Sequence, residues 1–360
     1  MIANSRLQNL RRRLAENEID AILISQPENR YYLSGFDGSA GFLLVTPQKA
    51  ILATDFRYIE QAGTQAPDYE VFHMIGNTTN WFPGLIEGLH IEKLGFEAEH
   101  FTFSMGRQLS DTLNKKQLPI KLVPVNGLVE SLRAVKEPGE IELIKRAVEI
   151  ADAAYEYIEG VMQAGMTERQ AAWEIEKHMR ENGSQAIPFE IIVASGPNSA
   201  LPHARPSERT IGAGEPIVID MGAKFDGYAS DLSRTIYLGT PENTFKKVYN
   251  TVLDAQLTAV SIINEGMTGE QADSSARAVI ERAGYGEAFG HALGHGIGLA
   301  PHESPRLGSG SNEPLASGMV FTIEPGIYLP GWGGVRIEDT VMMENGKAKL
   351  ISMARKVRYD

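Results

Sequence analysis

The sequence predicts two domains: an α/β domain with a mixed sheet, followed by an α+β domain built from a duplicated unit. Short apolar runs alternate with helical stretches from residue 20 to about residue 133, which indicates the first domain. Pro138 precedes a long helical pattern from Ile141 to Met162, and the rest of the chain contains an internal repeat. Because proline is favoured at a helix start, we place the boundary beside it, giving domains of residues 1–135 and 136–360.

The first domain is expected to begin with a helix and to continue as alternating strands and helices. Leu7, Leu10 and Leu14 lie at helical spacing and predict an amphipathic helix. Apolar runs predict strands at residues 21–24, 41–45, 50–53, 70–74 and 120–123. Helices are expected from residues 57–62 and 106–113. This alternation favours a mixed sheet covered by helices.

The second domain repeats itself about a hundred residues apart. Residues 165–171 (GMTERQA) recur as residues 266–272 (GMTGEQA), and each copy follows a long helix and opens another. Thr167 and Thr268 are the expected helix N-caps. Pro202–Pro206 is echoed by Pro301–Pro305, and an acidic hairpin at 217–231 by residues 320–338. A duplicated unit that closes on itself would bring four carboxylates to one centre.

The hairpin at residues 217–231 supplies the first two of these carboxylates. Asp226-Gly227 between two strand-like runs predicts a two-residue turn, which places Asp220 opposite Ser233. Asp231 then shares a face with Asp220, roughly 6 to 8 Å away by Cα. Like charges this close, beside Ile, Val and Leu, need a counter-charge, and a divalent metal can supply it. The alternative is a solvated hairpin with two surface aspartates.

Composition excludes several classes of function. A formal net charge of -12 with dispersed Lys and Arg argues against nucleic-acid binding. The absence of Cys excludes disulfides, thiolate metal sites and a Cys nucleophile, and suits a reducing cytoplasm. No apolar run approaches the roughly 20 residues of a membrane span, and the start does not resemble a signal peptide. We therefore expect a cytoplasmic protein that does not bind membranes.

Two histidines, His291 and His295, have the spacing of a helical zinc motif but not its context. Ala292 stands where that motif has Glu, and the glycines at 290, 294, 296 and 298 disfavour a helix. In an extended chain the two would lie about 13 Å apart, so only one can ligate the metal. A lone His is usually a core residue, but His203, His291, His295 and His302 all lie beside Gly or Pro in this half, which favours a site.

Five motifs of this chain resemble those of the aminopeptidase P and prolidase branch of the pita-bread metallopeptidases. They begin at residues 219 (IDMG), 230 (SDLSRT), 294 (GHGIG), 322 (TIEPG) and 335 (VRIED). Residues 34–41 and 54–58 are similar to that family's N-terminal domain. The resemblance implies a creatinase-type mixed-sheet α/β domain followed by a pseudo-twofold pita-bread domain.

The resemblance also implies the site and the reaction. Two divalent metal ions, most often Mn with Co or Zn as alternatives, would be bound by five ligands: Asp220, Asp231, His295, Glu324 and Glu338. Asp231 and Glu338 would bridge the ions, and a hydroxide between them would attack the scissile carbonyl. Glu324 would also handle the proton.

Further residues are expected to contact the substrate. The family's pattern gives His203 and His302 a role in substrate contact or in stabilising the tetrahedral intermediate, and places His291 and Tyr328 in the substrate pocket. Arg336 resembles the family's arginine that either supports a metal ligand or binds the substrate. The alternative for Arg336 is a plain salt bridge to a neighbouring carboxylate.

The reaction implied is hydrolysis of the bond between an N-terminal residue and a following proline in peptide substrates, by a homodimer. The motifs at residues 36–41 and 55–58 favour an aminopeptidase for longer peptides, and the short chain also fits a dipeptidase (prolidase). A non-catalytic binding module and a metal-free, creatinase-like hydrolase are the competing classes. Both are disfavoured because all five ligand positions are filled.

Overall fold

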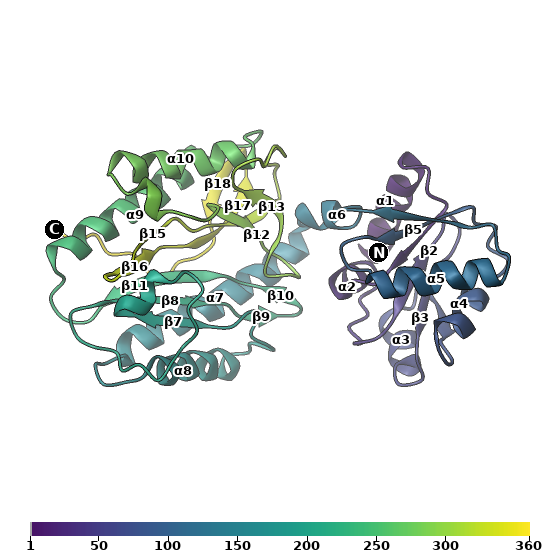
Figure 1. The fold of residues 1–360 in the computed structure, drawn as a ribbon, viewed down its shortest axis with the longest axis horizontal. Coiled ribbons are helices and arrows are strands. Elements are labelled where there is room, and N and C mark those ends of the chain that lie inside the picture. Colours follow the sequence, from purple (N-terminus) through teal and green to yellow (C-terminus); the bar gives the residue numbers. More distant parts are fainter. Residues whose placement is uncertain (1) are drawn as a thin grey trace. The chain divides into compact units, whose positions relative to one another are not determined.

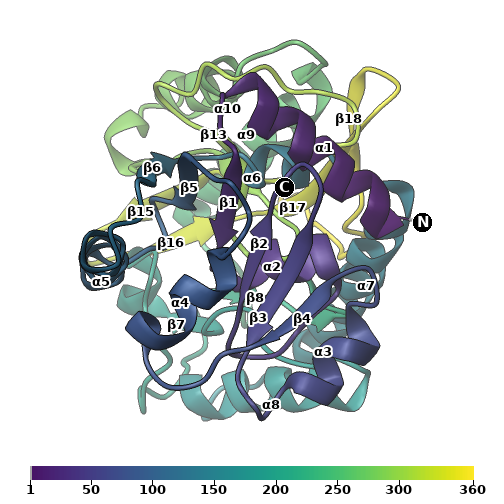
Figure 2. The ribbon, with the colours of Figure 1, turned by 90° about the vertical axis from the view of Figure 1, so that its right-hand side faces the viewer.

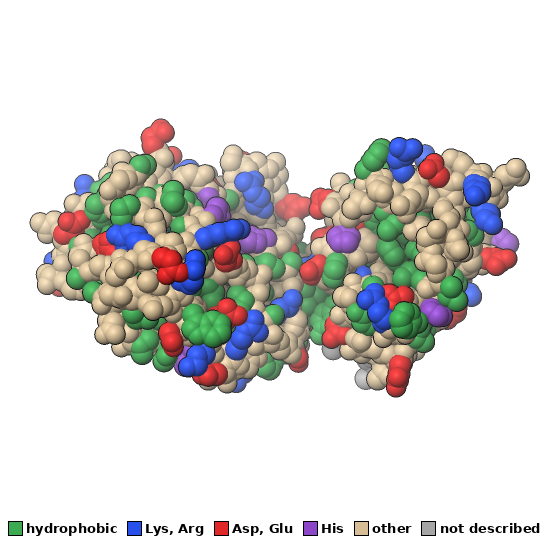
Figure 3. Space-filling model, turned by 60° about the horizontal axis from the view of Figure 1, so that its bottom comes forward, with side chains coloured by type: hydrophobic (Ala, Val, Ile, Leu, Met, Phe, Trp, Pro, Cys, Tyr) green, Lys and Arg blue, Asp and Glu red, His purple; other side chains and the backbone are tan. Residues whose placement is uncertain are grey.

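The computed structural model describes residues 2–360, with side chains from residue 5 onward, and the chain divides into two compact units. The first unit comprises Met1–Arg133 and the second Ala134–Asp360 (Figure 1). In the described residues, no helix combines the length and apolar composition that a membrane span requires. On the face drawn in Figure 3, Lys and Arg side chains are interspersed with Asp and Glu and form no single basic patch.

The first unit is a six-stranded mixed sheet with helices on it (Figure 2). The strand order is β4-β3-β2-β1-β5-β6, in which β1, β2 and β3 pair antiparallel and the other pairs are parallel. The elements are α1 (Ile2–Glu16), β1 (Ala21–Ile24), α2 (Pro27–Ser34), β2 (Phe42–Val45), β3 (Ala50–Thr54), α3 (Ile59–Gln65), β4 (Glu70–His73), α4 (Thr78–Ile86), β5 (Lys93–Glu97), α5 (Phe103–Lys115), β6 (Lys121–Val125) and α6 (Glu130–Ala134).

The predicted mixed α/β sheet is confirmed, and four elements were missed. Leu7, Leu10 and Leu14 are buried along α1 as expected. Alternate side chains of β1 to β3 pack with Trp81 and Phe82 of α4 in the core of this unit. The missed elements are α2, α4, β5 and α6.

The second unit contains the duplicated fold. Its first half consists of α7 (Pro138–Val161), α8 (Glu168–Glu181), β7 (Ile192–Ser195), η1 (Gly196–Ala200), β8 (Pro216–Met221), β9 (Lys224–Phe225), β10 (Tyr228–Ala229) and β11 (Leu232–Tyr237). The second half consists of α9 (Asn243–Ile262), α10 (Gly269–Arg282), η2 (Gly286–Ala288), β12 (Gly294–Gly296), β13 (Glu303–Leu307), β14 (Val320–Ile323), β15 (Gly326–Leu329), β16 (Gly333–Arg336), β17 (Asp339–Glu344) and β18 (Lys347–Leu350).

Each half has two helices packed on its own sheet, and each has its own core. The sheet orders are β11-β8-β7 and β13-β12-β14-β17-β18. Thr167 and Thr268 cap α8 and α10, each accepting a hydrogen bond from the backbone N–H of a Gln three residues on. In Figure 1, α9 and α10 cover one sheet and α7 and α8 lie along the other. The predicted repeat is thus confirmed in the order and capping of its elements.

The Asp-Gly turn sets the register of the first hairpin as predicted. Asp226 and Gly227 both have positive φ, 46° and 84°, which is the geometry of a type I′ turn. β9 pairs with β10 beside this turn, and β8 pairs with β11 beyond it, with Asp220 opposite Ser233. The hairpin therefore presents Asp220 and Asp231 at the same end of the β8–β11 ladder.

Candidate metal centre

The first two carboxylates of the site come from the β8–β11 hairpin. Asp220 is the fifth residue of β8, and Asp231 immediately precedes β11. Asp231 is only 5% exposed, and the side chain of Asp220 is 16% exposed. Two aspartates at this depth exclude the alternative of a solvated hairpin with surface charges.

The second half supplies two glutamates at matching positions. Glu324 directly follows β14, and Glu338 directly precedes β17, flanking the pair Ile323 and Asp339 of that ladder. Hydrogen bonds then join the halves, since Glu338 N donates to Ser233 O at 3.0 Å and Thr340 Oγ1 donates to Asp231 O at 3.0 Å. The backbones that carry Asp231 and Glu338 are therefore tied directly to each other.

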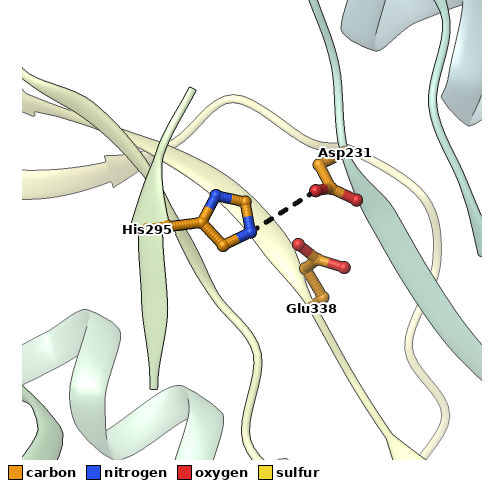
Figure 4. A group of neighbouring side chains, drawn as sticks. All are labelled: Asp231, His295 and Glu338. Carbon is orange, nitrogen blue, oxygen red and sulfur yellow. Dashed lines mark ion pairs between the residues drawn. The ribbon is translucent and has the colours of Figure 1, made fainter. Parts of the chain in front are cut away.

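His295 on β12 completes the cluster. Its Nε2 lies 3.6 Å from Asp231 Oδ2 and 3.3 Å from Glu324 Oε1. Figure 4 shows Asp231, His295 and Glu338 pointing toward one another, with one ligand atom from each lying within 4.8 Å of the others. His295 Nδ1 lies 3.1 Å from Gly296 O and can donate to that carbonyl, so Nε2 is the ring nitrogen that faces the carboxylates and the candidate ligand atom.

Glycines allow the backbone of β12 to come this close to its neighbours. A Cβ at Gly294 would lie 2.0 Å from Thr322 O, and one at Gly296 would lie 2.1 Å from Ser304 O. Thr322 also accepts a hydrogen bond from His295 N and donates one to Glu324 Oε1, both at 3.1 Å. The expectation of an extended, closely approached glycine segment is confirmed, while the role of Thr322 was missed.

The cluster carries more negative charge than its own cations balance. Burial, and then the charges of Glu338, Asp220 and Glu324, raise the pKa of Asp231 well above its usual value. Burial, and then the charges of Glu324 and Asp220, raise the pKa of Glu338 well above its usual value. Burial alone would raise the pKa of Glu324, but the hydrogen bond and charge of His295 lower it overall. The site thus favours an added positive charge.

Two buried oxygens show where a cation fits. Within the described residues, Asp220 Oδ1 and Glu338 Oε1 are buried side-chain atoms without a hydrogen-bond partner. Leaving such an acceptor unsatisfied costs roughly 1–3 kcal/mol or more for a charged group. Four carboxylates with one imidazole suit hard or borderline divalent ions. The residues present therefore fit a metal centre.

Arg336 lies behind the cluster and contacts it through Asp220. Its Nη2 donates to Asp220 Oδ2 at 2.7 Å, its Nε to Ser233 Oγ at 2.8 Å, and its Nη1 to the Tyr328 hydroxyl at 2.9 Å. The structure shows the salt bridge that was the alternative for Arg336, and its partner is an expected metal ligand. Ser233 was predicted to lie opposite Asp220, but its hydrogen bond to Arg336 was not predicted.

His291 is joined to the same network through Tyr328. Its Nε2 lies 3.0 Å from the Tyr328 hydroxyl, and its Nδ1 lies 2.8 Å from Ala292 O. With Nδ1 donating to the carbonyl, Nε2 accepts the phenol proton, and the phenol oxygen accepts from Arg336. Burial lowers the pKa of His291, which favours this neutral form. Both ring nitrogens are therefore engaged, so His291 contributes its ring surface.

The other two histidines expected in the site, His203 and His302, are both exposed. The ring of His302 lies 4.1 Å from that of His295, centroid to centroid. Partial burial, followed by the charge of His295, lowers the pKa of His302.

His203 is exposed, on the segment that follows η1. That segment is held by a residue the sequence analysis missed, Glu168, whose buried carboxylate accepts hydrogen bonds from Ser195, Asn198 and Ser207.

Comparisons with known proteins identify the family. Residues 142–345 match metallopeptidase family M24, and residues 6–135 match the creatinase/prolidase N-terminal domain. An Xaa-Pro dipeptidase of Pyrococcus furiosus is 37% identical over 362 residues, covering 98% of this chain and 99% of the relative.

Solved structures agree with this assignment. An Xaa-Pro dipeptidase from Bacillus anthracis superimposes with a TM-score of 0.94 at 42% identity, covering 99% of both chains. An X-Pro aminopeptidase from Thermotoga maritima gives a TM-score of 0.88 at 37% identity, covering 98% of both chains. The creatinase-type and pita-bread domains expected from the motifs are confirmed. The chain belongs to metallopeptidase family M24 and carries the family's creatinase/prolidase N-terminal domain.

Proposed function

We propose that this protein hydrolyses the peptide bond between an N-terminal residue and a following proline. The observation that carries the proposal is the convergence of Asp231, His295 and Glu338, from both halves of the duplicated unit, on one buried centre. This centre carries more negative charge than its own cations balance. The relatives that share this fold over their full length are named as Xaa-Pro dipeptidases and as an X-Pro aminopeptidase.

The ligand set of the proposed centre comprises Asp220, Asp231, His295, Glu324 and Glu338, with Asp231 and Glu338 shared between two ions. Manganese is the expected metal, and cobalt or zinc also suits these donors. When bound, two such ions polarise the scissile carbonyl and lower the pKa of a water molecule. The side chains of this protein then have to orient the substrate and move protons.

Glu324 is suited to accept the proton of the attacking water. Its pKa is lowered overall by His295, and Thr322 donates to its Oε1, so it is ionised at neutral pH. His302 has a lowered pKa and is neutral at that pH, so its N–H can donate to the oxygen on which charge develops. His203 is exposed on the segment after η1, and we assign it to substrate contact.

Proline at the second position explains why the substrate pocket must recognise shape. The Xaa-Pro nitrogen carries no hydrogen, so a peptidase cannot hold it through a backbone N–H donor. His291 and Tyr328 offer a rigid aromatic wall instead, because Arg336 and Ala292 O hold both rings in place. Such a wall can favour the pyrrolidine ring over an open-chain residue by contact area.

Two substrate ranges are distinguished by different observations. The motifs at residues 36–41 and 55–58 favour an aminopeptidase that acts on longer peptides. The names of the relatives from Pyrococcus furiosus and Bacillus anthracis favour a dipeptidase. We retain the aminopeptidase as the first candidate and the dipeptidase as the second, in a homodimer whose size a sizing column would establish.

The test compares Ala-Pro, Ala-Pro-Ala and Ala-Ala-Ala with the manganese-loaded protein. The aminopeptidase releases alanine from Ala-Pro-Ala, the dipeptidase cleaves Ala-Pro alone, and neither cleaves Ala-Ala-Ala at a comparable rate. Asp231→Ala and Glu338→Ala should abolish both activities. Full activity in either variant would refute the ligand assignment, and cleavage of neither proline peptide with Mn, Co or Zn would refute the proposed function.

A further inference from the structure

The last ten residues, 351–360, form an extended segment without helix or strand, here called the C-terminal segment. Its side chains alternate, since Ser352 and Ala354 are buried and Met353 and Arg355 are exposed. Alternation of this kind is typical of an extended chain with one face packed on the protein. The buried face of the C-terminal segment therefore points toward the duplicated fold.

The first helix of each repeat holds this segment. In α7, the Asp152 carboxylate accepts hydrogen bonds from Met353 N at 2.7 Å and Ala354 N at 3.1 Å. In α9, the side chain of Asn250 exchanges two hydrogen bonds with the backbone of Tyr359. The C-terminal segment thus bridges the two halves whose strands carry the metal ligands.

Its most deeply placed charge, Lys356, pairs with a carboxylate next to a metal ligand. Asp339 is fully buried and directly follows Glu338. It accepts from Arg234 Nη2 at 2.7 Å, from Gln256 Nε2 at 2.6 Å and from the Lys356 ammonium. Two cations and an amide thus hold one buried carboxylate, and one of the cations belongs to the C-terminal segment.

Arg234 connects this carboxylate to the backbones of the metal centre. Its Nη1 donates to Ser233 O at 3.0 Å and to Glu338 O, so one guanidinium group joins the first-half strand to the second-half ligand. Its other nitrogens donate to Ala354 O at 2.6 Å and Arg355 O at 3.2 Å. The guanidinium is planar and only 1% exposed, so these contacts fix its orientation.

We propose that Arg234, Asp339 and Lys356 form a positioning cluster that sets how closely the strands carrying Asp231 and Glu338 approach each other. None of the three needs to touch the substrate or a metal ion. The cluster contacts the backbone next to Asp231 and Glu338 and thereby fixes the positions of these two ligands. The C-terminal segment stabilises the cluster by supplying Lys356. This inference rests on the proposed metal centre and gives the C-terminal segment a role in it.

The expected effect of replacing Lys356 on metal binding is taken from residues that support a metal ligand without touching the metal ion. Loss of such a partner typically weakens metal binding or activity by roughly 10–100-fold. Because Lys356 is one of three donors to Asp339, we expect Lys356→Met to weaken manganese binding by about 10-fold, toward the lower end of that range. The value of kcat should fall while KM for Ala-Pro-Ala or Ala-Pro stays within about twofold, since the substrate contacts are intact.

The experiment measures manganese affinity by calorimetric titration for wild type, Lys356→Met and Lys356→Arg. Arg358→Met is the matched control, because Arg358 lies in the same segment and pairs with Asp254 where both side chains are about half exposed. We expect Lys356→Arg to restore wild-type affinity and Arg358→Met to leave it unchanged. If circular dichroism shows Lys356→Met to be unfolded, Lys356→Gln, which keeps a donor without the charge, replaces it.

Wild-type manganese affinity in the Met or Gln variant, or an equal loss in Arg358→Met, would overturn the positioning role. The titration is independent of the substrate. If the wild-type protein binds manganese but cleaves no Xaa-Pro peptide, the proposed function fails while the titration still decides the role of Lys356.

Discussion

Replacing Asp231 with Asn should stabilise the metal-free protein while removing its response to metal. Asp231 and Glu338 are buried together, and each raises the other's energy when charged. Their nearest ligand atoms lie within 4.8 Å, so two charges there repel by about 3 to 4 kcal/mol at an effective dielectric constant near 20. Arg336 and His295 offset part of this repulsion. We expect the free energy of unfolding to rise by about 1–3 kcal/mol at pH 7.

Asp231 also makes the free energy of unfolding of the metal-free protein depend on pH. Folding raises the pKa of Asp231 above its usual value of 3.8, so the metal-free folded state binds this proton more tightly than the unfolded state does. Below about pH 4 the Asp231 carboxyl group is protonated in both the folded and the unfolded state and does not lower the free energy of unfolding. As pH rises from there through the folded-state pKa, the free energy of unfolding falls. The advantage of Asp231→Asn should accordingly be larger at pH 7 than at pH 4.

Thermal unfolding of EDTA-treated protein, with and without added manganese, measures both effects. For a unit of this size a gain of 1–3 kcal/mol corresponds to a rise in Tm of roughly 2–12 °C. Asp226→Asn is the control, because Asp226 is exposed at the turn of the same hairpin and Asn also tolerates its positive φ. A lower Tm for metal-free Asp231→Asn than for the control would show that the Asp231 charge does not destabilise the metal-free protein. A full manganese-induced rise in Tm in this variant would show that Asp231 is not needed to bind the metal.

Three further predictions follow from the contacts around the centre. Arg336→Met removes the charge partner of Asp220 and should raise the Kd for manganese by roughly 10–100-fold, and an unchanged calorimetric Kd would contradict this. Gly294→Ala places a Cβ 2.0 Å from a backbone oxygen and should lower the free energy of unfolding by about 3 kcal/mol or more. Gly290→Ala, with open space around it, should change the same urea-unfolding measurement by less than about 0.5 kcal/mol, and similar effects at both glycines would count against the geometry. Tyr328→Phe deprives His291 Nε2 of its donor and should cost roughly 1–3 kcal/mol, so wild-type stability in that variant would show the network to be unimportant.

The parts of the site that the sequence predicted are those governed by local rules. Asp226-Gly227 determines a turn, the turn determines the register, and the register places Asp220 opposite Ser233. The glycines around His295 likewise predicted close backbone contact. In the structure, a Cβ at Gly294 or Gly296 would clash with a neighbouring backbone oxygen. The repeat was visible because Thr167 and Thr268 cap equivalent helices with the same residue pattern.

The parts that the sequence did not predict depend on partners far away along the chain. Arg234 bonds to the backbone of Arg355, 121 residues later, and nothing near either residue signals the contact. Glu168 is the first residue of α8 and looks in the sequence like an ordinary acidic residue of a first helical turn. In the structure its carboxylate accepts hydrogen bonds from Ser195 and Ser207. Strand β5 was missed for the same reason, because its short run with Gly95 becomes a strand only between β1 and β6.

We propose that five side chains from the two halves of the repeat hold a pair of divalent ions. Diffraction from manganese-soaked crystals, collected at the manganese absorption edge, tests it most directly. We expect two anomalous peaks in each protein chain, with Asp231 and Glu338 contacting both and with Asp220, His295 and Glu324 completing the ligand set. Peaks elsewhere, or none at this cluster at saturating manganese, would contradict it.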